Sequence, residues 1–180
     1  MKIALIGTHG IGKTTAVLNL ASELKKLGFN VGIVEEVARI CPFPINEKTT
    51  LKSQEWMLYK HHLNELEKEA QYNIVISDRS ILDVYCYYYR FFGKNELMEN
   101  FVKEKIKGYN FLFKMPINKD YLKKDNFRST DIIFQKEIDE IMYSFLKQFD
   151  ISFCEFESLE KTISLIKDKI NYNTKSHKFF

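Results

Sequence analysis

The sequence predicts a three-layer α/β fold, in which helices cover both faces of a parallel sheet of five strands. Three observations lead to this prediction. Short apolar runs alternate with longer segments of helical period, the pattern of strands joined by crossover helices. A glycine-rich stretch separates the first apolar run from the first helical segment. The length of 180 residues and the 45% hydrophobic composition suit one compact domain with a proper core.

Five apolar runs are the candidate strands of this sheet. Each is followed by a helical segment or by a loop that leads to one, as a parallel sheet requires. In chain order the candidate strands are KIALIG at 2–7, NVGIVEE at 30–36, NIVISD at 73–78, YNFLFKM at 109–115 and ISFCEFE at 151–157.

Segments of helical period occupy the intervals between these runs. The first helix follows the glycine-rich stretch and ends at Gly28. A longer helix is expected from about residue 50 to residue 71, and two shorter helices divide near Gly93. The clearest helix begins after Thr130, because its apolar residues recur at i, i+3 and i+4.

Two segments lack a regular period. Residues 116–130 are polar and basic, which predicts a mobile surface loop that could act as a short lid. Residues 172–180 form a polar tail, and the sequence leaves open whether this tail is flexible or docks its two terminal phenylalanines on the body. No repeat, low-complexity tract or linker divides the chain, so we expect a single domain over residues 1–180.

Composition argues against several classes of protein. The net charge of +3, from 27 basic and 24 acidic residues, is too weak to favour nucleic acid or an anionic membrane as a partner. No apolar run approaches the ~18 residues that cross a bilayer, and no export signal is recognisable. The three cysteines are far apart and suggest neither a disulfide framework nor a zinc site. We therefore expect a cytoplasmic protein that does not enter the membrane.

The stretch GTHGIGKTT, residues 7–15, predicts a phosphate-binding loop. It matches the pattern G-x-x-x-x-G-K-[ST], with a strand before it and a helix after it. The N–H groups of such a loop point inward at an anion, and the positive end of the helix dipole adds attraction. We expect Lys13 to reach the outer phosphates of a nucleotide. The expected nucleotide-binding residues are Gly7, Thr8, His9, Gly10, Ile11, Gly12, Lys13, Thr14 and Thr15.

A magnesium site is expected beside this loop. The hydroxyl of Thr14 would bind Mg²⁺ directly, and Asp78, at the end of the third strand, would hold it through water. Both residues leave the sheet at the same edge. His9 is interpreted as a tolerated variable position of the loop rather than as a base. The sequence does not distinguish ATP from GTP.

Other classes of phosphate-loop protein fit less well. A GTPase would carry glycine three residues after Asp78, where Ile81 stands, and its N/T-K-x-D motif has only a shortened counterpart after the wrong strand. A partition-type ATPase would carry a second lysine early in the loop, where Thr8 and His9 stand.

Four stretches together resemble the small P-loop kinases of the nucleoside and nucleotide kinase group. They are GTHGIGKTT, VEEVAR, ISDRSILDVYCY and FRSTD. Within this group the chain looks most similar to AAA-type P-loop proteins grouped with the ribosylnicotinamide kinase domain. The resemblance extends from Met1 to about Lys169. It implies a P-loop NTPase fold with a short lid, with ATP and Mg²⁺ as cofactors.

The resemblance also implies an acceptor site. It makes Glu36 a ligand of the acceptor hydroxyl or a general base, with Glu35 as the rival, because ligands bind at the carboxyl ends of parallel strands. Arg39 and Arg79 would contact the acceptor or its phosphates, and Asp83 would add a substrate contact. Alternatives stay open: the acids could solvate a strand end, Arg39 could be a surface residue, and Asp83 could favour its helix through the dipole.

Other polar and aromatic residues are interpreted as structural. The cluster VYCYYYRFF at 84–92 is predicted to be core, because aromatic residues at helical spacing are more often buried than stacked on a substrate. Gln54 and Trp56 are interpreted in the same way. His61 and His62 are adjacent on a helix and point in different directions, so we do not expect them to share a metal.

The leading hypothesis is a Mg-ATP-dependent phosphotransferase that acts on a hydroxyl or phosphate of a small nucleoside- or nucleotide-like acceptor. Its expected catalytic residues are Lys13, Glu36, Asp78 and Arg128, the last arriving from the lid. The alternatives are a regulatory ATPase module without a small-molecule acceptor and a polynucleotide 5'-end kinase. The sequence leaves open whether the protein is a homodimer.

Overall fold

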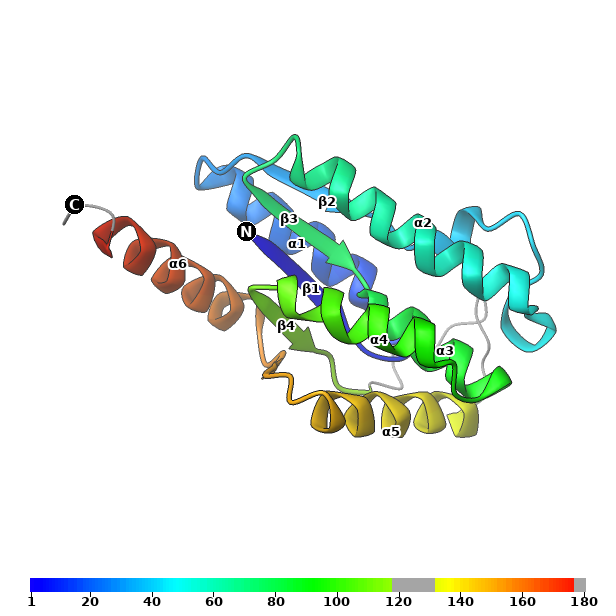
Figure 1. Cartoon of the computed structure of the whole chain (residues 1–180). Helices are drawn as coiled ribbons and strands as arrows, with labels where there is room; N and C mark the ends of the chain where they lie inside the picture. The colour runs from blue at the N-terminus through cyan, green and yellow to red at the C-terminus, as the bar shows by residue number, and fades with distance from the viewer. Residues whose placement is uncertain (118–131, 177–180) are drawn as a thin grey trace.

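A parallel sheet of five strands lies at the centre of the molecule, in the order β2-β3-β1-β4-β5 (Figure 1). The computed structural model describes residues 1–117 and 132–176, with side chains through residue 171. All four pairings are parallel, which confirms the predicted sheet. The strands are β1 (Lys2–Ile6), β2 (Val31–Val34), β3 (Ile74–Asp78), β4 (Phe111–Lys114) and β5 (Cys154–Glu155).

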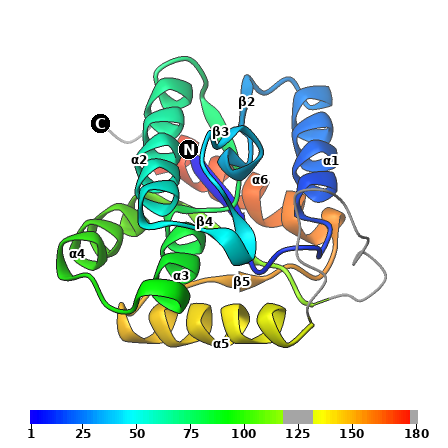
Figure 2. The ribbon, with the colours of Figure 1, turned by 90° about the vertical axis from the view of Figure 1, so that its right-hand side faces the viewer.

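Helices lie on both faces of this sheet, as Figures 1 and 2 show. The apolar cores place α1 and α6 against one face and α2, α3, α4 and α5 against the other. The α-helices are α1 (Lys13–Lys26), α2 (Leu51–Glu69), α3 (Ile81–Phe92), α4 (Glu96–Lys105), α5 (Ile132–Gln148) and α6 (Leu159–Ser176). Short 3-10 turns are η1 (Val37–Ile40), η2 (Asn46–Lys48) and η3 (Ile106–Gly108). The three-layer α/β arrangement is therefore the predicted one.

The central strand β1 divides its side chains between the two cores. Ile3 and Leu5 pack with α1 and α6, whereas Ala4 and Ile6 pack with the helices of the opposite face. Successive side chains of a strand point to opposite faces. Every residue of β1 is buried, and after Lys2 the strand is apolar from Ile3 to Ile6, as expected for a central parallel strand.

Capping residues determine where α2 and α3 begin. Thr50 caps α2, and its Oγ1 accepts a hydrogen bond from the backbone N–H of Ser53. Ser80 caps α3 in the same way through the N–H groups of Leu82 and Asp83. Gly93, with a φ of 75°, ends α3 before α4. The predicted helix boundaries near residues 50 and 93 are confirmed.

The C-terminal helix α6 extends further than the sequence interpretation allowed. It runs through Ser176, so residues 172–176 are helical rather than part of an irregular tail. Ile166 is fully buried against the face that α1 covers, and Ile163 and Ile170 pack beside it. Their i, i+3, i+4 spacing was the signal that could have identified this helix. The terminal phenylalanines lie outside the described residues.

Within residues 1–117 and 132–176, every helix is too short or too polar to cross a bilayer.

Candidate functional site

The loop between β1 and α1 winds into a cradle because three of its glycines adopt left-handed backbone conformations. The φ angles are 138° at Gly7, 66° at Gly10 and 86° at Gly12. Only glycine adopts such angles at little cost. A Cβ atom at Gly7 would also lie 2.8 Å from Cδ1 of Ile11 and 3.2 Å from the carbonyl oxygen of Met115. The cradle therefore depends on glycine at this position for both torsion and space.

The ammonium group of Lys13 folds back over the cradle. Its Nζ donates a hydrogen bond of 2.8 Å to the carbonyl oxygen of Gly7 and another to the carbonyl oxygen of Thr8. Burial, together with the positive charge of Arg79, lowers the pKa of Lys13 to about 7. The ammonium is thus held by neutral carbonyl groups at the place where the outer phosphates of a bound nucleotide would offer charged oxygens.

Thr14 and Asp78 meet at the sheet edge beside this cradle. The hydroxyl of Thr14 donates a hydrogen bond of 2.5 Å to Oδ2 of Asp78. Asp78 is buried, and its Oδ1 has no hydrogen-bond partner among the described residues. Burial, and next the charge of Glu36, raises the pKa of Asp78. A hydroxyl beside an unsatisfied buried carboxylate oxygen fits Mg²⁺, which prefers oxygen ligands.

Glu36 and Arg79 form a buried ion pair where β2 and β3 end. The Nε atom of Arg79 lies 2.6 Å from Oε1 of Glu36. Burial alone would lower the pKa of Arg79, but the carboxylate of Glu36 raises it well above its ordinary value. Arg79 has a φ of 86°, a strained conformation that costs ~1–3 kcal/mol and is often found at functional sites. Glu35 is exposed, so Glu36 is the acid that faces inward.

Arg39 lies at the outer side of the same carboxylate. Its Nε is 3.5 Å from Oε2 of Glu36, and 38% of its side chain is exposed. Glu36 therefore carries an arginine on each of its two oxygens.

Asp83 lies in the first turn of α3, next to the phosphate loop. It is fully buried, its Oδ1 accepts from the N–H of Gly7 at 3.0 Å, and its Oδ2 accepts from the N–H and hydroxyl of Ser80 at 2.7 Å. Both oxygens are thus occupied beneath the phosphate loop. Asp83 thus ties the loop to the start of α3, in line with the alternative that it stabilises the beginning of its helix.

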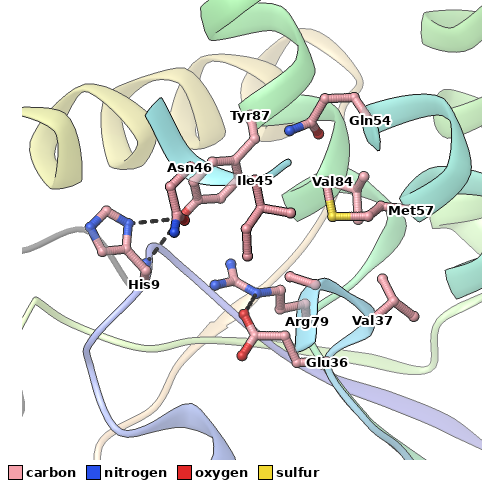
Figure 3. Close-up of a pocket in the computed structure, with 11 residues that line it drawn as sticks. His9, Glu36, Val37, Ile45, Asn46, Gln54, Met57, Arg79, Val84 and Tyr87 are labelled. Carbon is pink, nitrogen blue, oxygen red and sulfur yellow. Dashed lines mark hydrogen bonds and ion pairs between the residues drawn. The ribbon is translucent and has the colours of Figure 1, made fainter. Parts of the chain in front are cut away.

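A pocket opens next to the Glu36–Arg79 pair (Figure 3). Its interior cavity measures about 50 Å³. The polar lining residues are His9, Glu36, Asn46, Gln54, Arg79 and Tyr87. The apolar lining residues are Val37, Ala38, Ile45, Met57 and Val84.

Tyr87 and Gln54 line this pocket. Tyr87 also packs against the apolar core, as predicted for its cluster. Gln54 is 3% exposed, and within the part of the chain that the structure describes its Oε1 has no hydrogen-bond partner. Tyr87 lies four residues after Asp83 and seven after Ser80, so the three share one face of α3. This spacing was the sequence signal that could have placed Tyr87 at the pocket, because the face of α3 that carries it begins beside the phosphate loop.

His9 is a buried junction between the loop and two helices, not a tolerated variable position. Its backbone N–H donates to the hydroxyl of Tyr87 at 3.1 Å, and its Nδ1 lies 2.9 Å from the same hydroxyl. The amide of Gln135 in α5 donates to its carbonyl oxygen at 2.7 Å. Burial, with Arg79 and Lys13 adding to it, lowers the pKa of His9 to about 4, so the ring is neutral near pH 7.

A second hollow of about 180 Å³ adjoins the other end of the loop. It lies between the start of α1 and the segments that follow β4 and β5. Its lining residues include Gly12, Thr15, Asn19, Met115, Phe156 and Leu159. Arg128 and the expected lid from residue 118 onward lie outside the described residues.

Several solved structures share this fold. A protein described as NadR in complex with NR superposes with a TM-score of 0.66 at 19% identity, over 87% of this chain and 45% of that one. The chain thus spans less than half of that protein. A deoxyadenosine kinase from M. mycoides gives 0.60 at 22% identity, over 96% of this chain and 99% of that one. A thymidylate kinase from Ehrlichia chaffeensis gives 0.64 at 20%, over 92% and 98%.

The resemblance to nucleoside and nucleotide kinases is therefore confirmed at the level of the fold. Among curated proteins, none matches the sequence significantly. A family model described as an AAA domain matches residues 2–161, which include the phosphate loop and the acids at the ends of β2 and β3. The chain belongs to this AAA domain family (AAA_28).

Proposed function

We propose that the protein transfers the γ-phosphoryl group of Mg-ATP to a hydroxyl or phosphate of a small acceptor. One observation carries this proposal: the phosphate loop and the pocket with Glu36 adjoin in one crevice. Arg79 belongs to both, because it pairs with Glu36 at 2.6 Å and its NH1 lies 3.5 Å from the carbonyl oxygen of Gly7. Ligands of open α/β sheets bind at this edge of the sheet.

The nucleotide would occupy the cradle and the second hollow. Its phosphate oxygens would accept hydrogen bonds from the N–H groups of the loop and from the ammonium of Lys13. Lys13 would then exchange its two carbonyl partners for charged oxygens. Thr14 and Asp78 would hold Mg²⁺, which when bound neutralises charge on the phosphates. The base of the nucleotide would lie in the second hollow, beside Thr15 and Asn19.

The acceptor would enter the pocket with its reacting oxygen near Glu36. In the transfer, a new bond forms between this oxygen and the γ-phosphorus, and the bond from that phosphorus to the oxygen of ADP breaks. When the acceptor is a hydroxyl, its proton passes to the carboxylate of Glu36. Arg79 would stabilise charge on the transferring group. Arg128, from the lid, would add a second guanidinium on closure, worth about 10³-fold in comparable systems.

The names of the similar structures support a small acceptor of this kind. Two are named as kinases of deoxyadenosine and of thymidylate, and the third is described in complex with NR. These names belong to proteins that are 19–22% identical, so they support the class of reaction and not one substrate.

The test is a panel of nucleosides, nucleotides and vitamin precursors assayed for ADP release above the acceptor-free rate. At least one acceptor should raise the rate, and Lys13→Ala should abolish the increase. A rate that no acceptor raises, with ATP bound, would instead favour a regulatory ATPase module.

A further inference from the structure

The charges around the pocket are already paired with one another. Glu36 and Arg79 are the charged residues among its described lining, and they form an ion pair at 2.6 Å. NH1 of Arg79 also lies 4.0 Å from Oδ1 of Asp83, so this guanidinium stands between two carboxylates. The nearby Arg39 is engaged with the other oxygen of Glu36. Both described arginines at the pocket therefore contact the same carboxylate, that of Glu36.

The other described residues of the pocket lining carry no charge. The ring of His9 is unprotonated near pH 7, and Asn46, Gln54 and Tyr87 carry no charge. Five further lining residues are apolar. The buried Oε1 of Gln54 lacks a hydrogen-bond partner, and a buried acceptor of this kind favours a ligand that carries a neutral N–H or O–H donor.

We infer that the acceptor carries no phosphate and that the γ-phosphoryl group goes to a hydroxyl of an uncharged molecule such as a nucleoside. This inference rests on the proposed function and narrows it. A phosphomonoester brings nearly two negative charges near pH 7. To bind here it would have to displace Glu36 from Arg79, which would break the buried ion pair of 2.6 Å and bring the charges of the phosphate close to that carboxylate.

The chemistry of the acceptor agrees with this charge balance. A hydroxyl must lose a proton as it attacks phosphorus, and Glu36 offers a buried carboxylate for that proton. A phosphomonoester oxygen is already ionised near pH 7 and has no such need. The carboxylate of Glu36 can thus accept the proton of an acceptor hydroxyl, whereas it would repel an acceptor phosphate.

The first arm of the test compares matched acceptors in transfer. The pairs are thymidine with dTMP, deoxyadenosine with dAMP and deoxycytidine with dCMP, each assayed with Mg-ATP for the phosphorylated product. We expect product from at least one nucleoside, with kcat/KM at least about ten-fold above that of its monophosphate. A monophosphate that is the better acceptor would overturn the inference and leave the proposed kinase activity standing. Product from neither member of any pair would count against the proposed function itself.

The second arm measures binding and does not depend on turnover. Glu36→Gln removes the competitor of the acceptor phosphate for Arg79, so the affinity for dTMP and dAMP by calorimetry should rise about ten-fold or more. Glu35→Gln is the matched control, because it removes the same charge from the exposed neighbour and should change these affinities less than about two-fold. Unchanged monophosphate affinity in a folded Glu36→Gln variant, or an equal rise in both variants, would contradict the inference.

Discussion

The phosphate loop and the acceptor pocket are built in different ways, although they share one crevice. The loop is a single stretch of chain, and its glycine torsions and backbone groups make the cradle. The pocket takes its lining from the loop, the ends of β2 and β3, η2, α2 and α3. A site built from backbone groups depends on a few positions, and those positions tolerate few substitutions. A site made of side chains from many elements can change its ligand while the fold stays the same.

The largest expected effect is on the loop. Lys13→Ala should lower phosphoryl transfer by about 10²-fold or more, because a buried cation beside the transferring group is lost. Triphosphate affinity, measured by calorimetry, should also fall sharply while the thermal unfolding midpoint stays close to the parent value. Unchanged nucleotide affinity in a folded variant would contradict the assignment of this loop as the phosphate-binding site.

The next largest effect should distinguish the role of the pocket in transfer from the role of the loop in ATP binding. Glu36→Gln should reduce transfer by about 10²-fold, the usual range for a general base, while ATP affinity stays within a few-fold. Glu35→Gln should retain the parent rate because Glu35 is exposed. Loss of transfer in Glu35→Gln with a normal Glu36→Gln would reverse the assignment of the two acids.

The third effect compares two glycines with positive φ. Gly7→Ala should destabilise the protein by about 1–3 kcal/mol, since strain adds to the close contacts with Ile11 and Met115. Gly28→Ala is the control, because φ is 86° there and a Cβ would meet nothing within 4 Å. It should cost only the torsional part, about 1 kcal/mol. Equal costs in urea unfolding would show that the space at Gly7 is unimportant.

A smaller effect should appear with pH at the junction of the two regions. Burial lowers the pKa of His9 from its ordinary value of 6.5 to about 4, so the unfolded chain binds the proton more readily. Stability from this site is therefore complete above pH 6.5 and is lost as pH falls toward 4, by about 1–3 kcal/mol. The free energy of unfolding should fall less steeply over this window in His9→Gln. A parallel pH dependence would exclude a buried neutral His9.

The smallest effect tests the hydroxyl that joins pocket and loop. Tyr87→Phe removes the hydroxyl that accepts from the backbone N–H of His9 and leaves its Nδ1 with the longer contact of 3.3 Å to the hydroxyl of Thr8. This loss should cost about 1 kcal/mol of stability and raise the KM for ATP modestly. Tyr89→Phe changes an exposed tyrosine on the same helix and should be neutral by both measures. Two indistinguishable variants would mean that Tyr87 serves only as packing.

The same contrast explains what the sequence could predict. The loop, the strands and Asp78 were recognisable because each belongs to a local pattern with its own periodicity or spacing. Tyr87, Gln54 and the role of His9 were not, because their position depends on how α2 and α3 pack over the loop. For Asp83 the sequence left two roles open, because a helix cap and a ligand-binding acid cannot be told apart from their positions in the chain alone.

The central claim is that loop and pocket act together in one transfer, and the most direct measurement is the ratio of phosphorylated acceptor to ADP. With an acceptor that stimulates turnover, the products would be followed by phosphorus NMR and mass spectrometry. The account predicts one phosphorylated acceptor for each ADP, and loss of both products in Glu36→Gln. ADP and inorganic phosphate formed without a phosphorylated acceptor, at a rate that Glu36→Gln leaves unchanged, would contradict it.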